Sequence, residues 1–358
     1  MTRLAPALVL VLTLSSATAT SAQAINIERF RPTLDRFGFL GIQGSATPGH
    51  LRWNLALWTW YSNKPLRVRF ADGTSETAID HRLTSDLLFQ LGLFGRWSLA
   101  LEVPLLLYQT GETSITGFGV EDPRFTSKIR LVGKKTEKIQ NKPDGPGLGL
   151  LVMVPVPIGS ESFYASEDQF SFDLQALGDF HLLGAGAGLM LGWRYRVNAR
   201  SVGDDTLGQE MLYGFSLKPP IPPAKGLFGL IELRGSTSFR GRRTNTLEGD
   251  IGVRYTKKDV TMTAAFGGGL VRGLGQPRFR AIFGVSWSPK TNDMDNDGIP
   301  DSIDECPRLP EDFDGFEDQD GCMDPDNDND FIPDADDLCP NEQALEGQDE
   351  NEDGCTDP

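Results

Sequence analysis

Twelve residues near the end of the chain, Asp293 to Asp304, have the side chains and the spacing of a metal-binding loop. In "DMDNDGIPDSID" carboxylates stand at the first, third, fifth, ninth and twelfth positions, and the sixth is glycine. Calcium takes about six to eight hard oxygen ligands, and a loop with this spacing supplies them, with a backbone carbonyl at the seventh position. The predicted calcium ligands are Asp293, Asp295, Asp297, the carbonyl of Ile299, Asp301 and Asp304.

A second copy of the loop follows, because residues 293–325 and 326–358 align without a gap. Phe331 stands where the first copy has Gly298. The sharp turn needs a left-handed backbone that strains phenylalanine, so we expect the second site to bind calcium more weakly. No helix pattern flanks either loop, so the two copies are not EF-hands. The ligands predicted in the second copy are Asp326, Asp328, Asp330, the carbonyl of Ile332, Asp334 and Asp337.

The N-terminus predicts export from the cytoplasm. Arg3, an apolar run from Ala7 to Leu14 and the small residues of "SAQA" form the three zones of a secretory signal, which we expect to occupy residues 1–24. The alternative interpretation is a buried N-terminal helix. Beyond this segment no apolar run approaches the roughly 20 residues of a spanning helix, so any insertion into a membrane would use strands.

All four cysteines lie in the two acidic units, and an even number in an exported chain favours disulfides. The gaps between them, of 16, 17 and 16 residues, do not match the short spacing of zinc sites. Three connectivities are possible. We favour Cys306 with Cys322 and Cys339 with Cys355, because these pairs close each unit on itself.

The pattern DxDxDGxxDxxDxCP, in tandem and with a second acidic half ending in DGC, resembles thrombospondin type 3 repeats over residues 293–358. The resemblance implies a stalk without helices that winds around several calcium ions. A disordered tail is the alternative, since 26 carboxylates in 66 residues repel one another without a cation. The resemblance also implies further ligands in the second half of the first unit: Asp312, Asp314, Asp318, Asp320 and Asp324.

Charge divides the chain near Pro289. Residues 1–292 hold 33 basic and 24 acidic residues, a net charge of +9, whereas residues 293–358 hold 1 and 26, a net charge of −25. We therefore expect an N-terminal periplasmic segment at 25–49, a β-domain at 50–288 and the calcium-binding repeats at 289–358.

The β-domain has a dominant period of two, which indicates half-buried strands. In "FSFDLQALGDF" apolar residues such as Phe170 and Leu174 alternate with polar ones such as Asp173. Strands of about ten residues suit a membrane barrel. Tight turns, such as those at 94–96, 182–186 and 256–259, are expected after the even-numbered strands, and longer loops after the odd-numbered ones, at 63–80, 107–124, 156–169 and 198–208. We predict an all-β antiparallel transmembrane barrel of about 12 strands, with a soluble sandwich as the alternative. The predicted strands are 51–60, 83–93, 97–106, 125–132, 148–155, 170–180, 187–197, 209–219, 229–238, 245–255, 260–270 and 278–288.

Each face of the predicted barrel has its own residues. Aromatic residues near strand ends suit the two membrane interfaces: Trp58, Trp60, Tyr61, Trp97, Trp193, Tyr195 and Trp287. Charged residues of both signs would line the interior: Arg52, Arg82, Asp86, Glu102, Asp173, Arg194, Arg196, Glu232, Arg234, Glu248, Asp250, Arg254, Arg278 and Arg280. Such a lumen can either be closed by ion pairs or leave a narrow polar path.

The order of the parts also resembles a family. Residues 29–66, a barrel and thrombospondin-like repeats resemble OmpA-like outer-membrane proteins, which carry such repeats before a peptidoglycan-binding domain. The sequence ends at Pro358 with no segment that could be that domain, so the resemblance does not extend to wall anchoring.

Catalytic chemistry is not expected. The β-domain has three histidines and no thiol, and its glycine-rich stretches "GFGVED" and "DGPGLG" lack the P-loop lysine. The acidic tail would repel nucleic acid. We expect a non-enzymatic outer-membrane structural barrel with a calcium-stiffened periplasmic stalk. The expected partners are membrane lipid, the barrel-insertion machinery and other envelope components. The alternatives are a porin-like pore for small solutes and a secreted or surface calcium-dependent adhesion module.

Overall fold

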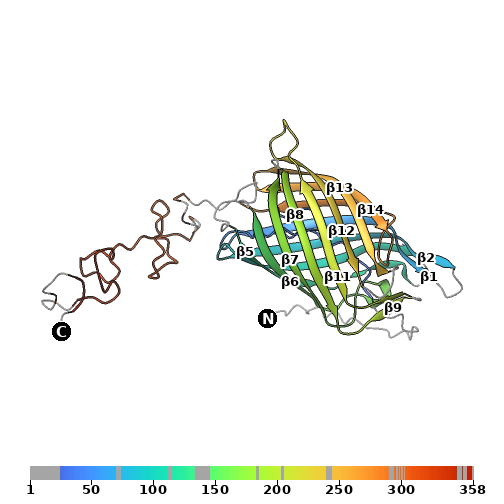
Figure 1. The fold of residues 1–358 in the computed structure, drawn as a ribbon, viewed down its shortest axis with the longest axis horizontal. Helices are drawn as coiled ribbons and strands as arrows, with labels where there is room; N and C mark the ends of the chain where they lie inside the picture. The colour runs from blue at the N-terminus through green and yellow to red at the C-terminus, as the bar shows by residue number, and fades with distance from the viewer. Residues whose placement is uncertain are drawn as a thin grey trace, which may run out of the picture.

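The computed structural model of the chain describes residues 25–69, 74–111, 115–133, 146–182, 185–202, 205–238, 244–289, 294–295, 297, 299, 301, 303–344, 349 and 353–356. The expected secretory signal lies outside these residues. Thirteen of the described strands form one sheet, and twelve of them close into an antiparallel barrel (Figure 1). The wall strands are β1 (Trp53–Arg69), β2 (Ser75–Leu93), β3 (Trp97–Gly111), β5 (Arg124–Val132), β6 (Gly147–Pro155), β7 (Ser171–Leu182), β8 (Ala185–Arg196), β11 (Glu210–Lys218), β12 (Leu227–Thr237), β13 (Thr246–Lys257), β14 (Val260–Val271) and β15 (Phe279–Trp287).

The barrel closes where its first and last strands pair. Leu55 of β1 lies opposite Trp287 of β15, and the pairing continues to Asn63 and Phe279. On its other side β1 pairs with β2, so each wall strand has two neighbours. Closure leaves no free edge in the wall, which is the requirement for strands that cross a lipid layer.

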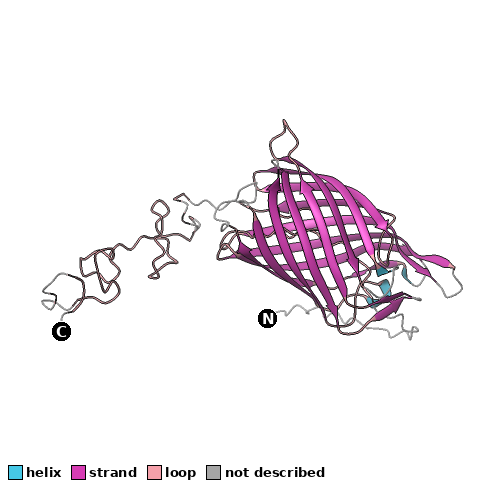
Figure 2. Cartoon of the chain, viewed as in Figure 1, coloured by secondary structure: helices cyan, strands magenta, loops and turns pink. Residues whose placement is uncertain are grey.

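Short elements decorate one end of the barrel (Figure 2). Strand β4 (Gly117–Val120) pairs with β3, and β9 (Arg200–Val202) forms a hairpin with β10 (Asp205–Leu207). A 3-10 turn, η2 (Glu161–Phe163), lies beside β4. Among the described residues no helix is long and apolar enough to span a membrane. We call this the loop end, and the opposite end, with the tight turn at 94–96, the turn end.

All twelve predicted strands are present, and the connections differ in two places. We expected a loop at 63–80, but β1 continues to Arg69 and β2 begins at Ser75, so the two strands extend as a hairpin. A register shift between Asn63 and Leu66 marks the point where this extension begins. The expected short connection after β5 is also wrong, because 133–146 separate β5 from β6.

The wall is apolar outside and polar inside. On β3 the exposed Leu99 and Leu101 alternate with the buried Ser98 and Glu102. The same alternation runs through β7, where the exposed Leu174 lies between the buried Asp173 and Gln175. A soluble sandwich would bury its apolar face, so that alternative is wrong. An outward apolar belt on a closed barrel is the surface that lipid requires.

Residues 25–49, which we call the lumenal segment, lie inside the barrel. We expected them outside it in the periplasm, and this expectation is wrong. The segment enters at the loop end, where the Ile27 amide donates to the Tyr164 carbonyl at 3.2 Å. It reaches the turn end at Thr47, whose hydroxyl donates to the Gly95 carbonyl at 3.3 Å. The physical reason is burial, since Phe30, Leu40 and other apolar residues of the segment are fully enclosed.

Candidate functional site

The inward face of the wall carries a network of paired charges. Arg124 bonds to Asp86 and, at 2.7 Å, to Glu102. Across the barrel Arg234 lies 2.7 Å from Glu248 and 2.8 Å from Asp250. A buried charge needs a partner of opposite sign, and each of these side chains has one. Of the residues predicted to line the interior, all are buried except Arg278, which is exposed because it precedes the start of β15.

Three ion pairs hold the lumenal segment to the wall. Glu28 accepts from Arg280 at 2.9 Å, Arg29 donates to Glu210 at 2.7 Å, and Asp35 accepts from Lys128 at 2.6 Å. All six side chains are at most 6 % exposed. These pairs lie on different wall strands, β15, β11 and β5, so they fix the segment from several sides.

Two wall carboxylates bind the backbone of the lumenal segment. Glu232 on β12 accepts from three successive amides, those of Leu40 at 3.0 Å, Gly41 at 2.8 Å and Ile42 at 3.2 Å. Asp179 on β7 accepts from the amide of Ser45 and, at 2.8 Å, from its hydroxyl. Charge-assisted bonds of this kind are stronger than neutral ones, and they satisfy a backbone that forms no ladder of its own.

Apolar side chains complete the filling of the lumen. Phe30 packs edge-on against Trp60, with ring centroids 5.1 Å apart, and lies beneath the guanidinium of Arg234. Trp58 and Trp60 were expected at a membrane interface, and this expectation is wrong. They point inward because they share a face of β1 with the buried Asn54. The interior therefore contains an apolar core between segment and wall.

Glycines in the wall make room for the segment. A Cβ added at Gly188 on β8 would lie 2.1 Å from the Phe39 ring, and one at Gly214 on β11 would lie 2.6 Å from the Ile42 side chain. Side chains at these inward positions would therefore collide with the segment. The wall and the lumenal segment are complementary in shape as well as in charge.

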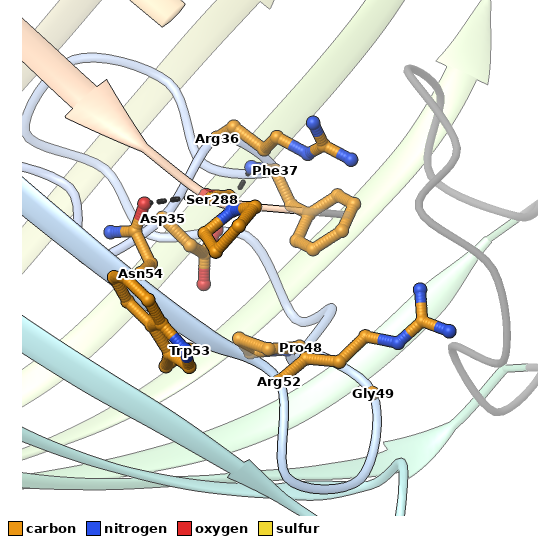
Figure 3. Close-up of a pocket in the computed structure, with 10 residues that line it drawn as sticks. Asp35, Arg36, Phe37, Pro48, Gly49, Arg52, Trp53, Asn54 and Ser288 are labelled. Atoms are coloured by element: carbon orange, nitrogen blue, oxygen red, sulfur yellow. Dashed lines mark hydrogen bonds between the residues drawn. The ribbon is translucent and has the colours of Figure 1, made fainter. Parts of the chain in front are cut away.

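A small pocket lies at the turn end, between the lumenal segment and the ends of β1 and β15 (Figure 3). Asp35, Arg36 and Phe37 form one side, and Arg52 and Trp53 lie opposite. The Ser288 hydroxyl closes it by donating to the Asn54 side chain at 2.6 Å. At the loop end the segment contributes Ile25 and Ile27 to a second buried apolar cluster.

The acidic repeats bring their carboxylates together in clusters. Ligand atoms of Asp295, Asp297 and Asp304 lie within 4.8 Å of one another, and so do those of Asp326, Asp328 and Asp330. The third cluster contains residues of the second half of the first unit: Glu317, Asp320 and Asp324. Glu317 was not among the predicted ligands, although its position is repeated as Glu350 in the second unit.

The clusters have the donor set of a cation site. One oxygen of Asp304 accepts from the Cys306 amide at 2.7 Å, and its other oxygen is buried without a partner in the described structure. Asp337 in the second unit has the same arrangement with the Cys339 amide, at 2.6 Å. Burial, and then the nearby charges of Asp297 and Asp295, raises the pKa of Asp304. Unpaired buried carboxylate oxygens that face one another fit a hard divalent ion.

The remaining predicted ligands lie outside these clusters. Asp301 and Asp334 accept from the amides of Met294 and Asn327, at 2.8 and 3.0 Å. Asp314 accepts from the Asn327 side chain at 2.8 Å, which links the two units. Asp293 lies outside the described residues. Asp312, Asp318, Ile299 and Ile332 are in none of the three carboxylate clusters, and neither is Asp337.

Other predictions about the repeats are confirmed. The disulfides join Cys306 to Cys322 and Cys339 to Cys355. Phe331 has a φ of 77°, the left-handed conformation that we expected to strain it. The glycine of each DGC motif lies against the last aspartate of its loop, and a Cβ on Gly321 would meet Asp304 at 2.4 Å.

Comparison with known proteins gives a fold and no family. No protein-family model and no curated protein matches the sequence. An outer membrane channel from Pseudomonas putida F1 is similar in structure, with a TM-score of 0.50 and 16% identity over 68% of this chain and 97% of that chain. The NanC porin, at 10% identity, has a TM-score of 0.42 over 65% of this chain and 98% of its own. The first similarity shows that this chain has the barrel fold of outer-membrane proteins.

Proposed function

We propose that the protein is an outer-membrane channel for small polar solutes, held closed by its own lumenal segment. The observation that carries this proposal is that residues 25–49 run through the lumen from the loop end to the turn end and are buried there. Many wall charges pair with one another, such as Arg194 with Asp173 and Arg124 with Glu102. These pairs would keep part of the lining polar and charge-balanced after the segment moves. The similarity to an outer membrane channel supports the proposal through its fold.

A reversible cross-link tests the channel. The Cβ of Ser45 lies 3.2 Å from the position of a Cβ on Gly149, which is close to disulfide geometry after a small shift. The wall and the lumenal segment contain no cysteine. In planar bilayers, the variant with Ser45→Cys and Gly149→Cys should carry no current when oxidised and should show openings when reduced. Ser45→Cys alone, given the same reductant, controls for reduction of the native disulfides.

Deletion of residues 25–49 provides the decisive outcome. The deleted protein, if heat-modifiable migration on gels shows a folded barrel, should conduct continuously. A folded barrel that carries no current after the deletion would exclude the channel.

A structural role for the barrel is the second candidate. The observation that favours it is the number of buried bonds between segment and wall, which include three ion pairs and the three amides held by Glu232. If the role is structural, the segment never leaves the lumen, and only the protein without residues 25–49 conducts. The cross-linked variant separates the two candidates, because a permanent segment gives the same silent record before and after reduction.

We also propose that the acidic repeats bind calcium and form a stiff stalk on the periplasmic side. Three clusters of carboxylates and the unpaired oxygens of Asp304 and Asp337 support this role. Calorimetric titration of the full chain with calcium should show saturable binding. The variant with Asp295→Asn and Asp297→Asn should lose the heat of the first loop, and an unchanged titration would exclude that site.

A further inference from the structure

We propose that the lumen contains a binding site for a small oxyanion, centred on the guanidinium of Arg31. The inference deepens the proposed channel function, because it names the class of solute. Arg31 lies on the lumenal segment and lines two neighbouring cavities. Both cavities are also lined by Arg194 and Asp173, so this ion pair lies beside Arg31 in each of them.

The unpaired groups that line these cavities are mostly hydrogen-bond donors. Within the described structure Arg31 has no partner for its buried Nε and Nη1 atoms, and the same is true of Nη2 of Arg29 and Nη1 of Arg124. The unpaired acceptors are amide oxygens of Gln175 and Gln276, which are neutral. A buried guanidinium without an acceptor is costly. These donors therefore need an anionic group that comes from outside the chain.

The carboxylates of the two cavities are already fully bonded. Both oxygens of Asp173 accept from Arg194, at 2.6 Å each. Both oxygens of Glu167 accept from Arg196, at 2.9 and 3.0 Å. Asp122 accepts from two backbone amides, at 2.9 and 3.0 Å. Asp173 and Glu167 are thus paired with other arginines, and both oxygens of Asp122 are held by the backbone.

Charges farther from the cavities do not neutralise Arg31 either. Arg124 and Arg194 add positive charge near it. Glu28 and Glu121 act on it with the opposite sign, but they are bonded to Arg280 at 2.9 Å and to Arg82 at 2.8 Å. A planar guanidinium fork pairs best with the two oxygens of a carboxylate, sulfate or phosphate group. The geometry therefore favours a small oxyanion over a cation or a neutral solute.

Calorimetric titration of the full-length, calcium-loaded protein with sodium sulfate at constant ionic strength tests the site. Wild type should bind sulfate saturably, and Arg31→Gln should weaken the affinity about tenfold or more, as expected for lost bonds to a charged group. Gln175→Glu should weaken it as well, because the new carboxylate would occupy the free donors. Arg36→Gln is the matched control, since it removes the same charge from the same segment at the turn end and should leave the Arg31-dependent affinity unchanged.

Either of two results would overturn the site: wild type that takes up no sulfate saturably, or Arg31→Gln protein that binds it as wild type does. Heat-modifiable migration on gels verifies that each variant is folded. The failure of the site and the failure of the channel are distinguishable. If the full-length protein binds sulfate through Arg31, but the protein without residues 25–49 carries no current, the site stands and the channel is excluded. If the protein without residues 25–49 conducts, but the full-length protein does not bind sulfate, the channel stands and the site is excluded.

Discussion

The barrel and the acidic repeats both bury carboxylates, and they neutralise the charge of these carboxylates in different ways. In the lumen Glu210 lies between Arg29 and Arg196, at 2.7 and 2.6 Å. In the repeats the buried Asp304 faces other carboxylates, and residues 293–358 contain one basic residue for 26 acidic ones. The barrel thus encodes its counter-charges in its own sequence, whereas the repeats need an ion from solution. Stability of the two regions should therefore respond to different variables.

Removal of calcium should give the largest difference between the two regions. Without the ion, carboxylates such as Asp326, Asp328 and Asp330 repel one another, so the repeats should extend and become sensitive to proteases. The barrel should keep its protease resistance and its heat-modifiable migration. Limited proteolysis with and without chelator measures both regions in one sample. Repeats that stay resistant after chelation would contradict the calcium requirement.

Loss of one internal counter-charge should be the next largest effect. Lys128→Met leaves the Asp35 carboxylate buried beside the lumen wall without its 2.6 Å partner, and breaking a buried pair costs about 3–5 kcal/mol. The measurement is the free energy of unfolding of the barrel in denaturant. Adding Asp35→Asn should recover part of the loss, because the buried charge is gone. The exposed Lys257→Met serves as the control and should change little.

If the double variant were as unstable as Lys128→Met alone, the loss would come from packing and not from charge. That result would mean that Lys128 does not act as an internal counter-charge, so the barrel would not differ from the repeats in this respect at Asp35.

Acidic pH should have a smaller effect, with opposite signs in the presence and absence of calcium. Burial first, and then neighbouring carboxylates, raises the pKa of Asp304 and of Asp324 above the ordinary 3.8. A raised pKa means that the calcium-free repeats are most stable when these groups are protonated, and that this stability is lost as pH rises through the raised pKa. Calcium binds the charged form, so the loaded repeats should loosen on acidification.

Small-angle scattering of calcium-free and calcium-loaded protein at neutral and acidic pH measures this inversion. The acid-induced change should be compaction in the first sample and expansion in the second. The same direction of change in both samples would argue against calcium as the counter-charge.

The sequence predicts the wall far better than it predicts the contents of the lumen. Strands such as β7 follow from strict alternation, which a half-exposed strand cannot avoid. The lumenal segment has no period, because its side chains meet the wall in all directions. Its apolar residues, such as Phe30, Phe39 and Leu40, indicate a segment that is buried and not exposed to solvent. Lys128 follows the same alternation as the predicted interior residues, so its inward position was predictable, whereas its partner Asp35 in the segment was not.

The metal clusters were predictable to the extent that they are local. Asp295, Asp297 and Asp304 come from a spacing within one loop, and the structure brings them together. Glu317 lies three residues before Asp320 and seven before Asp324 in the same unit, so the sequence also contains the signal for this cluster, although the predicted ligand set left Glu317 out.

The smallest expected effect concerns the difference between the two calcium loops. Phe331 adopts a left-handed backbone, with a φ of 77°, which costs a side chain about 1–2 kcal/mol relative to glycine, although glycine loses about 0.5–1 kcal/mol in chain entropy. Phe331→Gly should therefore tighten calcium binding to the second loop by no more than about tenfold, as measured by calorimetry. Phe313→Gly is a matched control, because Phe313 also has a positive φ, of 53°, but lies outside the second loop. Equal gains from the two variants would mean that strain relief stabilises the repeats as a whole, and that the difference between the loops has another cause.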